Sequence, residues 1–226
     1  MTPLERLCGG LPRLVMFDLD GTLMDSVPDL AAAVDAMLRQ LGRAPAGIAR
    51  VRDWVGNGSA TLVRRALAGG FATEAVDPAL AERALALFMQ AYEGGHALTT
   101  VYPGVPPVLD WLRERRVPLA VITNKPARFV EPLLAEKGLG GRFAWIVGGD
   151  TLAQQKPHPA GLQHVLAQAG VAAGEALFVG DSRNDVQAAR AAGVRCVALT
   201  YGYNHGRPIA EESPDLVLDD LRALIV

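Results

Sequence analysis

The sequence has few cysteines, little net charge and no long apolar run. Its only two cysteines, Cys8 and Cys196, lie far apart, so we expect two idle or buried thiols and no disulfide or metal pair. The net charge is -2, and the arginines are scattered among acids, which argues against nucleic acid as a partner. No apolar run approaches the ~20 residues that span a bilayer, and the N-terminus lacks the pattern of a secretion signal. We therefore expect a cytoplasmic protein without a membrane or nucleic-acid partner.

The 226 residues, half of them hydrophobic, are enough for one large domain or for a domain with a smaller insert. Short apolar runs alternate with segments that carry apolar residues at helical spacing, which is typical of a parallel sheet covered by helices. The sequence therefore predicts an α/β fold with a doubly wound parallel-sheet core. The expected strands lie in residues 13–18, 118–124, 143–149, 176–181, 195–200 and 214–220, and the expected helices span 105–116, 127–138, 159–170 and 183–193.

One long segment breaks this alternation. From residue 26 to about residue 100 there is no convincing strand, and helical patterns cover 26–42, 58–70 and 77–92. We interpret this segment as an all-helical domain inserted after the first strand, with hinges near 24–26 and 99–104. The predicted division is a core of residues 1–24 and 101–226 and an insert of residues 25–100.

Polar residues follow several of the predicted strands, at the edge where open α/β sheets bind ligands. Asp18 and Asp20 follow the first strand, with an i, i+2 spacing that turns both side chains to one side in an extended chain. Two anions that close repel, so a positive charge is expected between them. The other residues at these strand ends are Thr123, Asn124, Lys125, Lys156, Asp181 and Asp185.

These residue types complement one another chemically. Asp18, Asp20 and Asp181 would form an oxygen-rich site of the kind that Mg²⁺ prefers, and a carboxylate beside the ion can attack phosphorus. Thr123 and Lys156 would bind the remaining phosphoryl oxygens. A free Asp20 could protonate the leaving group and then activate water. Taken singly, each residue has an ordinary alternative as a helix cap, a turn residue or a surface charge. Their joint occurrence at successive strand ends favours the catalytic interpretation.

The chain resembles the haloacid dehalogenase superfamily of phosphohydrolases. Its motifs are "DLDGT" at 18–22, "TN" at 123–124, the lysine of "QKPHP" at 156, and "GDSRND" at 180–185. The resemblance implies that Asp18 is the nucleophile and forms an aspartyl-phosphate, and that Asp20 is the acid and base. It implies a Mg²⁺ ion held by Asp18, Asp181 and the backbone carbonyl of Asp20. Thr123, Asn124 and Lys156 would contact the phosphate, and Asp185 would lie in the layer around the metal ligands.

The helical insert is similar to the small cap domain of that superfamily, which closes over the site and sets substrate choice. Longer stretches, including "VGNG" in the insert and "GYNHG" near the end, resemble the members that hydrolyse 2-phosphoglycolate. Gly56, Asn57 and Gly58, just before a helix, would bind a small carboxylate, or form an ordinary loop and helix cap. We expect no direct catalytic part for His205 or Arg207.

The leading hypothesis is a Mg²⁺-dependent phosphatase for 2-phosphoglycolate, active as a monomer or homodimer on a small phosphorylated metabolite. A phosphatase for another such metabolite, a sugar phosphate or pyrophosphate, is a close alternative. A phosphomutase is disfavoured because the insert offers only one histidine, His96. A non-catalytic binding protein is disfavoured because Asp18 and Asp20 are both present.

Overall fold

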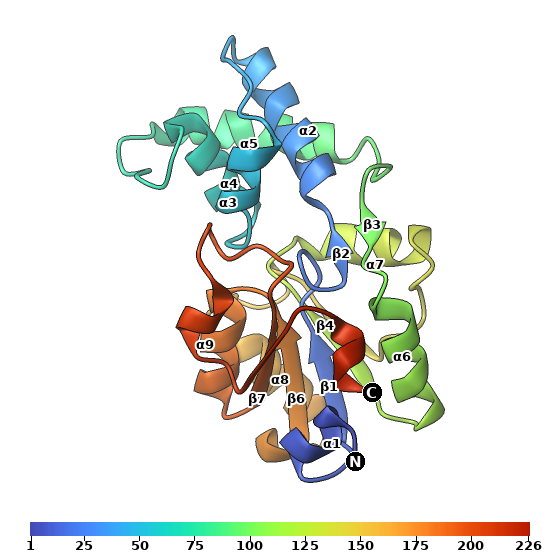
Figure 1. Cartoon of the computed structure of the whole chain (residues 1–226). Helices are drawn as coiled ribbons and strands as arrows, with labels where there is room; N and C mark the ends of the chain where they lie inside the picture. The colour runs from blue at the N-terminus through green and yellow to red at the C-terminus, as the bar shows by residue number, and fades with distance from the viewer.

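The computed structural model describes all 226 residues and has two parts, a helix-covered sheet and a bundle of helices above the strand ends (Figure 1). The sheet has six strands in the order β5-β4-β1-β6-β7-β8, and every neighbouring pair is parallel. The predicted doubly wound α/β class is thus confirmed, and each predicted apolar run contains one strand. These strands are β1 (Leu14–Phe17), β4 (Leu119–Ile122), β5 (Trp145–Val147), β6 (Ala176–Gly180), β7 (Arg195–Leu199) and β8 (Leu216–Leu218).

Alternation along the strands sends side chains into two separate cores, one on each face of the sheet. In β1, Val15 and Phe17 join the cluster beneath α6 (Val105–Glu114) and α7 (Ala127–Glu136). Leu14 and Met16 point the other way, toward α8 (Ala160–Ala169) and α9 (Arg183–Ala192). Because both faces are covered, the central strands are apolar throughout. All four predicted helices of this part are present, shorter by a few residues in total.

A helical bundle follows the first strand and lies over the carboxyl end of the sheet (Figure 1). It has its own hydrophobic cluster, which is joined by two residues of the sheet part, Phe129 and Tyr203. Its helices are α2 (Val27–Gln40), α3 (Ile48–Trp54), α4 (Ser59–Ala68) and α5 (Pro78–Tyr92). We call residues 25–100 the insert. The short helix α3 lies in a segment where no helix was predicted from the sequence.

The insert is tied to the sheet part by two antiparallel strands of two residues each. In β2 (Met24–Asp25) and β3 (Thr100–Val101), Met24 pairs with Val101 and Asp25 pairs with Thr100. Just beyond them, the Asp29 carboxylate accepts hydrogen bonds from the backbone N–H groups of Leu98 and Thr99 at 3.2 and 2.6 Å. The chain therefore enters and leaves the insert through one small ladder, which lies at the predicted hinges. The interpretation of the insert as a mobile cap stays a prediction.

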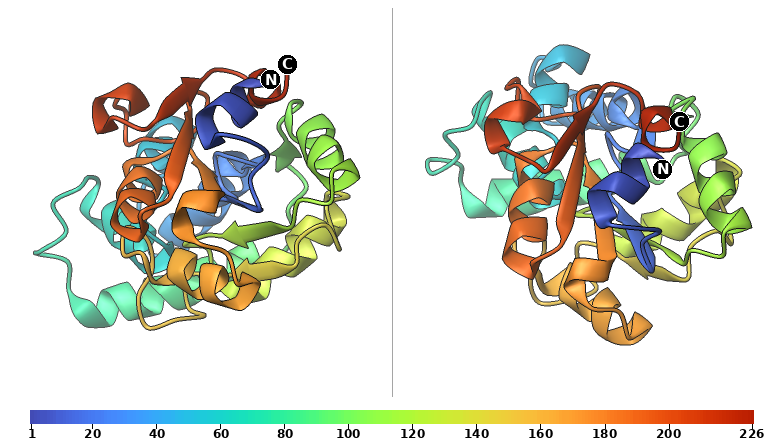
Figure 2. Two further views of the ribbon diagram at one scale, coloured as in Figure 1. Left: turned by 90° about the horizontal axis from the view of Figure 1, so that it is seen from below. Right: turned by 60° about the horizontal axis from the view of Figure 1, so that its bottom comes forward.

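The two chain ends lie close together (Figure 2), and Leu4 and Leu224 near them belong to the hydrophobic cluster on the α6 face of the sheet. The short helix α1 (Pro3–Cys8) there begins with a capping box, because the Thr2 hydroxyl accepts a hydrogen bond from the Glu5 N–H and the Glu5 carboxylate accepts one from the Thr2 N–H. The remaining segments are the 3₁₀ turns η1 (Ala173–Glu175), η2 (Ile209–Glu212) and η3 (Leu221–Leu224). Both cysteines carry free thiols, and none of the helices combines the length and apolar character needed to cross a bilayer.

Candidate active site

Asp18 stands directly after β1, at the centre of the sheet. Its backbone N–H donates to the Val179 carbonyl of β6 at 2.9 Å, so the strand pairing fixes the main chain up to this residue. The Asp18 carboxylate is buried, and its Oδ1 lies 2.8 Å from the Lys156 Nζ. That contact lacks hydrogen-bond geometry, which leaves Asp18 Oδ1 a buried oxygen without a hydrogen-bond partner.

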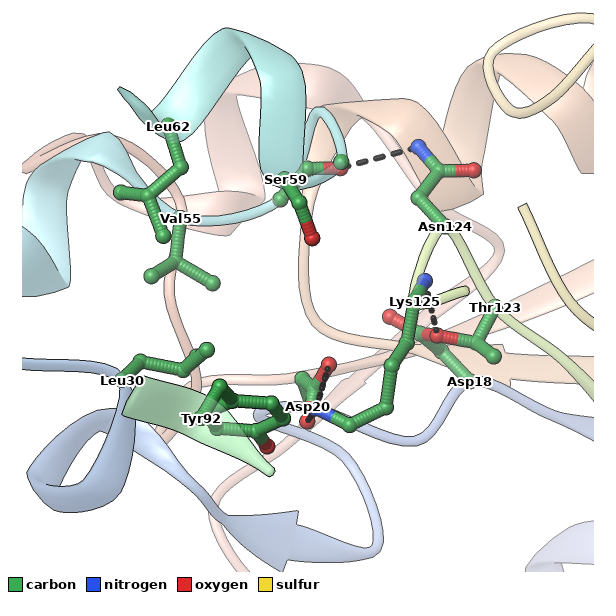
Figure 3. Close-up of a pocket in the computed structure, with 12 residues that line it drawn as sticks. Asp18, Asp20, Leu30, Val55, Ser59, Leu62, Tyr92, Thr123, Asn124 and Lys125 are labelled. Carbon is green, nitrogen blue, oxygen red and sulfur yellow. Dashed lines mark hydrogen bonds and ion pairs between the residues drawn. The ribbon is translucent and has the colours of Figure 1, made fainter. Parts of the chain in front are cut away.

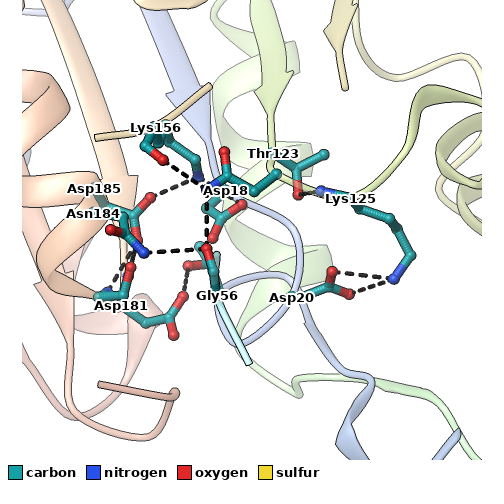
Figure 4. Close-up of polar contacts among 12 residues, drawn as sticks. Asp18, Asp20, Gly56, Thr123, Lys125, Lys156, Asp181, Asn184 and Asp185 are labelled. Carbon is teal, nitrogen blue, oxygen red and sulfur yellow. Dashed lines mark hydrogen bonds and ion pairs between the residues drawn. The ribbon is translucent and has the colours of Figure 1, made fainter. Parts of the chain in front are cut away.

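Asp185 holds the Lys156 side chain in place (Figure 4). Lys156 Nζ donates to Asp185 Oδ1 at 2.6 Å. The second oxygen of Asp185 accepts hydrogen bonds from the Ser182 hydroxyl and from the backbone N–H groups of Asp181 and Ser182. Both carboxylate oxygens are thus used by the protein at the start of α9. This arrangement fits the expected place of Asp185 in the layer around a metal site.

Asp181 follows β6 and faces Asp18 from the neighbouring strand. The Thr22 hydroxyl and the backbone N–H of Tyr203 donate to its two oxygens at 2.5 and 2.7 Å. Two glycines leave it room: a Cβ atom at Gly21 would lie 2.3 Å from Asp181 Oδ2, and one at Gly202 would lie 2.2 Å from the Asp181 Cβ. The "DLDGT" glycine is therefore required by the close approach of Asp181 as well as by its positive φ of 92°.

Three carboxylates converge here with only one ammonium group among them. One oxygen from each of Asp18, Asp181 and Asp185 lies within 4.8 Å of the others. Burial raises the pKa of Asp18 to about 7, against the lowering effect of Lys156, and Asp185 and Asp20 add to the rise. Burial and the two neighbouring carboxylates also raise the pKa of Asp181 well above its ordinary value. The surplus negative charge and the three carboxylates fit a divalent cation with oxygen ligands.

The Asp20 side chain is paired with Lys125 and does not join the three clustered carboxylates. Its carboxylate is neither free nor part of the acidic cluster; Lys125 Nζ lies 2.9 Å from its Oδ1 and 3.1 Å from its Oδ2 (Figure 4). The Ser26 hydroxyl donates to the same Oδ1 at 2.6 Å. Both carboxylates line the same cavity, as expected. The chain turns after Asp18, where the N–H groups of Leu23 and Met24 donate to the Leu19 carbonyl, and the Asp20 carboxylate is bound by Lys125.

Thr123 and Asn124 follow β4 and are both buried. The Thr123 N–H donates to the Val147 carbonyl at 2.9 Å, and its hydroxyl accepts from the Lys125 N–H at 3.2 Å, so its hydroxyl hydrogen is available to a ligand. The Asn124 amide donates to the carbonyls of Gly56 and Lys156 at 2.9 and 2.8 Å. Asn124 therefore connects three segments: the loop after β4, the Lys156 loop and the insert.

A small cavity lies between these strand ends and the insert (Figure 3). Its volume is about 40 Å³, well below the roughly 300–1,000 Å³ of pockets for drug-sized ligands. The sheet part contributes Asp18, Asp20, Thr123, Asn124 and Lys125 to its wall; the insert contributes Leu30, Val55, Gly56, Gly58, Ser59, Leu62 and Tyr92. One wall is thus polar and the other largely apolar.

The "VGNG" loop reaches the site in part. Gly56 lines the cavity, and its carbonyl accepts hydrogen bonds from Asn124 and Asn184 of the sheet part. Asn57 does not line the cavity. Its amide nitrogen donates to Asn184 Oδ1 at 3.2 Å, and its Oδ1 accepts from Arg65 at 3.0 Å. These contacts suit a residue that joins insert and sheet, and a role of Asn57 in substrate binding stays a prediction.

His205 and Arg207 lie outside the cavity. His205 Nδ1 contacts the Asp53 carbonyl of the insert at 2.8 Å, and Arg207 pairs with Glu211 at the surface. Lys125 and Tyr92 are among the lining residues to which the sequence analysis assigned no role. Lys125 was visible as the third letter of "TNK", but its partner lies 105 residues away, and Tyr92 ends a helix whose apolar pattern resembles any core helix.

With this geometry in view, comparisons with known proteins identify the class. Residues 12–193 match the family model of the haloacid dehalogenase-like hydrolases. The chain belongs to this family.

Within the family, the chain is similar to proteins named phosphoglycolate phosphatase. One from Pseudomonas putida is 66% identical over all of this chain and 83% of its own length. Phosphoglycolate phosphatase 1 from Pseudomonas aeruginosa is 66% identical over 95% of this chain and 79% of its own length. The crystal structure of a predicted phosphoglycolate phosphatase from Haemophilus somnus superimposes with a TM-score of 0.86 at 36% identity, covering 93% of this chain and 95% of its own.

Proposed function

We propose that this protein is a Mg²⁺-dependent phosphatase that hydrolyses 2-phosphoglycolate to glycolate and phosphate. The observation that carries the proposal is the Asp18 carboxylate, 2.8 Å from the Lys156 ammonium and beside Asp181, under a small cavity closed by the insert. The names of the relatives from Pseudomonas support the substrate. We further propose that it acts in the cytoplasm, as a monomer or homodimer.

In this proposal Asp18 is the nucleophile. One of its carboxylate oxygens forms a bond to phosphorus while the bond between phosphorus and the ester oxygen of glycolate breaks. Asp20 supplies a proton to the departing alkoxide and afterwards takes one from the water that attacks the aspartyl-phosphate. That attack releases phosphate and restores the Asp18 carboxylate. The place of Asp20 in the cavity wall supports this role.

The remaining polar residues stabilise the charge on the transferring group. Lys156 and the Thr123 hydroxyl would bind the phosphoryl oxygens, while Asp185 keeps the Lys156 ammonium beside Asp18. Asp18, Asp181 and the Asp20 backbone carbonyl would hold Mg²⁺, which neutralises phosphate charge and lets a carboxylate approach phosphorus. Asn124 would orient the phosphate side of the cavity through its contact with the Lys156 loop.

The insert would recognise the carboxylate of the substrate. Gly58 caps α4, and Leu62 is the first residue of that helix whose N–H donates back to the Gly58 carbonyl. The N–H groups of the first turn, beginning at Ser59, therefore lack partners within the helix, and Ser59 lines the cavity. A small anion bound there would lie across the cavity from Asp18. Gly56 would shape this wall with its backbone.

The experiment is a panel of phosphate esters that includes 2-phosphoglycolate, a sugar phosphate and pyrophosphate, assayed with Mg²⁺ and with EDTA. We expect phosphate release to be fastest from 2-phosphoglycolate, to be lost with EDTA, and to be lost in Asp18→Asn. The matched control is Asp219→Asn, at an exposed aspartate just after the edge strand β8, three strands away from β1. A metal-dependent preference for another ester would keep the chemistry and overturn the substrate. Activity of Asp18→Asn near that of the wild type would overturn the nucleophile.

A further inference from the structure

We propose that Lys125 is a positioning residue for Asp20 and that Tyr92 makes this positioning depend on the closure of the insert over the sheet. The inference rests on the proposed function, since Asp20 matters as an acid only if the protein cleaves phosphate esters. It assigns roles to two cavity residues, Lys125 and Tyr92, that the proposed function does not use.

Lys125 and Asp20 form a largely buried ion pair. Lys125 Nζ lies about equally far from both oxygens of Asp20, at 2.9 and 3.1 Å, which fixes the plane of the carboxylate as well as its position. The Lys125 side chain is only 2% exposed. A buried ion pair with two contacts holds its members far more firmly than a solvated one. The direction of the Asp20 carboxylate is therefore set by Lys125.

Tyr92 covers the Lys125 ammonium group. The ring of Tyr92, the last residue of α5, lies with its centroid 4.8 Å from Lys125 Nζ, within the range of a cation–π contact (Figure 3). The Tyr92 hydroxyl is buried and has no hydrogen-bond partner. The ring thus covers the Lys125 ammonium by its face and its bulk.

Aromatic contacts on both sides of the boundary between insert and sheet hold the Tyr92 ring in place. Its ring stacks on Phe88 of the insert with centroids 5.8 Å apart, and it meets Phe129 of the sheet part edge-on at 5.1 Å. Tyr92 therefore belongs to the insert and reaches Lys125 only while the insert rests on the sheet. With the insert lifted, the pair of Lys125 and Asp20 would face water, where an ion pair constrains its members weakly.

Ser26 provides a second link between the insert and Asp20. Ser26, whose hydroxyl donates to Asp20, is the residue between β2 and α2, where the chain enters the insert. Its backbone N–H donates to the Tyr203 hydroxyl at 3.1 Å. Two groups that depend on the insert, Tyr92 through Lys125 and Ser26 directly, thus converge on one carboxylate. An acid placed only in the closed state would act on bound substrate and not on an open, wet site.

The test uses the leaving group. An alkyl phosphate ester needs a proton on its departing oxygen, whereas p-nitrophenyl phosphate releases a stable anion and needs little help. We expect Lys125→Met to lower kcat/KM for 2-phosphoglycolate at least about tenfold more than for p-nitrophenyl phosphate. The ratio of the two values is independent of the fraction of folded enzyme. Lys125→Arg should restore most of the ratio, because it keeps the charge.

The closure part has its own variants. Tyr92→Leu removes the ring and should shift the ratio in the same direction, about threefold or more, whereas Tyr92→Phe keeps the ring and should leave it unchanged. Lys137→Met, at the end of α7, is the matched lysine control. Equal losses on both esters in Lys125→Met would overturn the positioning role, and an unchanged ratio in Tyr92→Leu would overturn the dependence on closure. A wild-type protein that cleaves neither ester would overturn the proposed function, and this inference with it.

Discussion

Asp18 and Asp20 are separated by one residue, yet each carboxylate is paired with a different buried lysine. Lys156 lies 2.8 Å from Asp18 and Lys125 lies 2.9 Å from Asp20. The two lysines come from the loops after β4 and β5, which lie on the same side of β1 in the sheet, and their side chains meet the two carboxylates separately (Figure 4). The repulsion within the motif is thus relieved by separation and by two cations. Because one aspartate lies in the acidic cluster and the other outside it, the pair can take different roles.

The acidic cluster predicts a measurable affinity for Mg²⁺. We expect Asp181→Asn to weaken Mg²⁺ binding at least about tenfold, because it removes one anionic oxygen ligand from a hard-cation site. Titration calorimetry of the folded protein with MgCl₂ measures this directly, without any assay of turnover. Asp219→Asn should bind Mg²⁺ like the wild type. Equal affinities for the wild type and Asp181→Asn would exclude this cluster as the metal site.

The raised pKa of Asp18 predicts how the stabilisation of the folded protein by Mg²⁺ depends on pH. Between the ordinary aspartate value near 4 and the folded value of about 7, the folded protein binds more protons than the unfolded chain. The metal-free protein therefore loses stability as the pH rises through this window. Mg²⁺ binds ionised carboxylates, so the stabilisation that it provides should increase as the pH rises through this window.

At saturating Mg²⁺, about 100-fold above Kd, the gain is about 2.7 kcal/mol, which corresponds to a rise in Tm of about 5–10 °C for a chain of this length. We expect that rise near pH 7.5 and a smaller one near pH 5.5. Differential scanning fluorimetry with Mg²⁺ and with EDTA at both pH values makes the measurement. A Mg²⁺ effect that is larger at the lower pH would contradict the link to Asp18.

Gly202 predicts a steric effect on the same site. A Cβ atom there would lie 2.2 Å from the Asp181 Cβ, so Gly202→Ala must displace Asp181 or its own loop. We expect unfolding to become easier by about 1–3 kcal/mol and Mg²⁺ affinity to fall, as measured by chemical denaturation and calorimetry. Gly174→Ala, at an exposed position with no atom within 4 Å of the new Cβ, should cost nothing. Similar stabilities for the two variants would show that the loop gives way freely.

Asn184 predicts an effect on the closed state. Its amide donates to the Gly56 carbonyl at 3.1 Å and accepts from Asn57 at 3.2 Å, so both contacts cross between insert and sheet. At about 0.5–1.5 kcal/mol for each hydrogen bond, Asn184→Ala should favour the open state and raise KM several-fold, with a smaller change in kcat. Steady-state kinetics tests this. Gln187→Ala on the same helix should match the wild type, and an unchanged KM in Asn184→Ala would remove the asparagine from the closing contacts.

Much of the fold could be predicted because its determinants are local. Each strand of the sheet is a short apolar run, and each helix packed on it ends near a glycine or a turn; Gly170 and Gly193 take the left-handed conformation just after α8 and α9. The helix α3 was missed because its N-cap is Gly47, with no side-chain cap, and it has only seven residues. A helix this short depends on packing, which its own sequence does not encode.

The site could be predicted in its membership and only partly in its geometry. Parallel strands bring their carboxyl ends to one edge, so Asp18, Thr123 and Asp181 had to be neighbours. Whether Asp20 faces the acidic cluster depends on the turn at Leu19 and on a lysine more than 100 residues away. Contacts of that range follow from the assembled tertiary structure, and so does the covering of Lys125 by Tyr92.

The ladder of β2 and β3 has a consequence for how such a chain can change over evolutionary time. Since Met24 pairs with Val101 and Asp25 with Thr100, the points where the polypeptide departs from the sheet and returns to it are adjacent. For the geometry of the sheet, the insert is equivalent to the loop of a hairpin, because its two ends are paired with each other whatever its length. The segment can be exchanged, lengthened or reduced without altering the order or register of any core strand. The insert can therefore change in sequence and length while the polar residues at the carboxyl ends of the core strands keep their places.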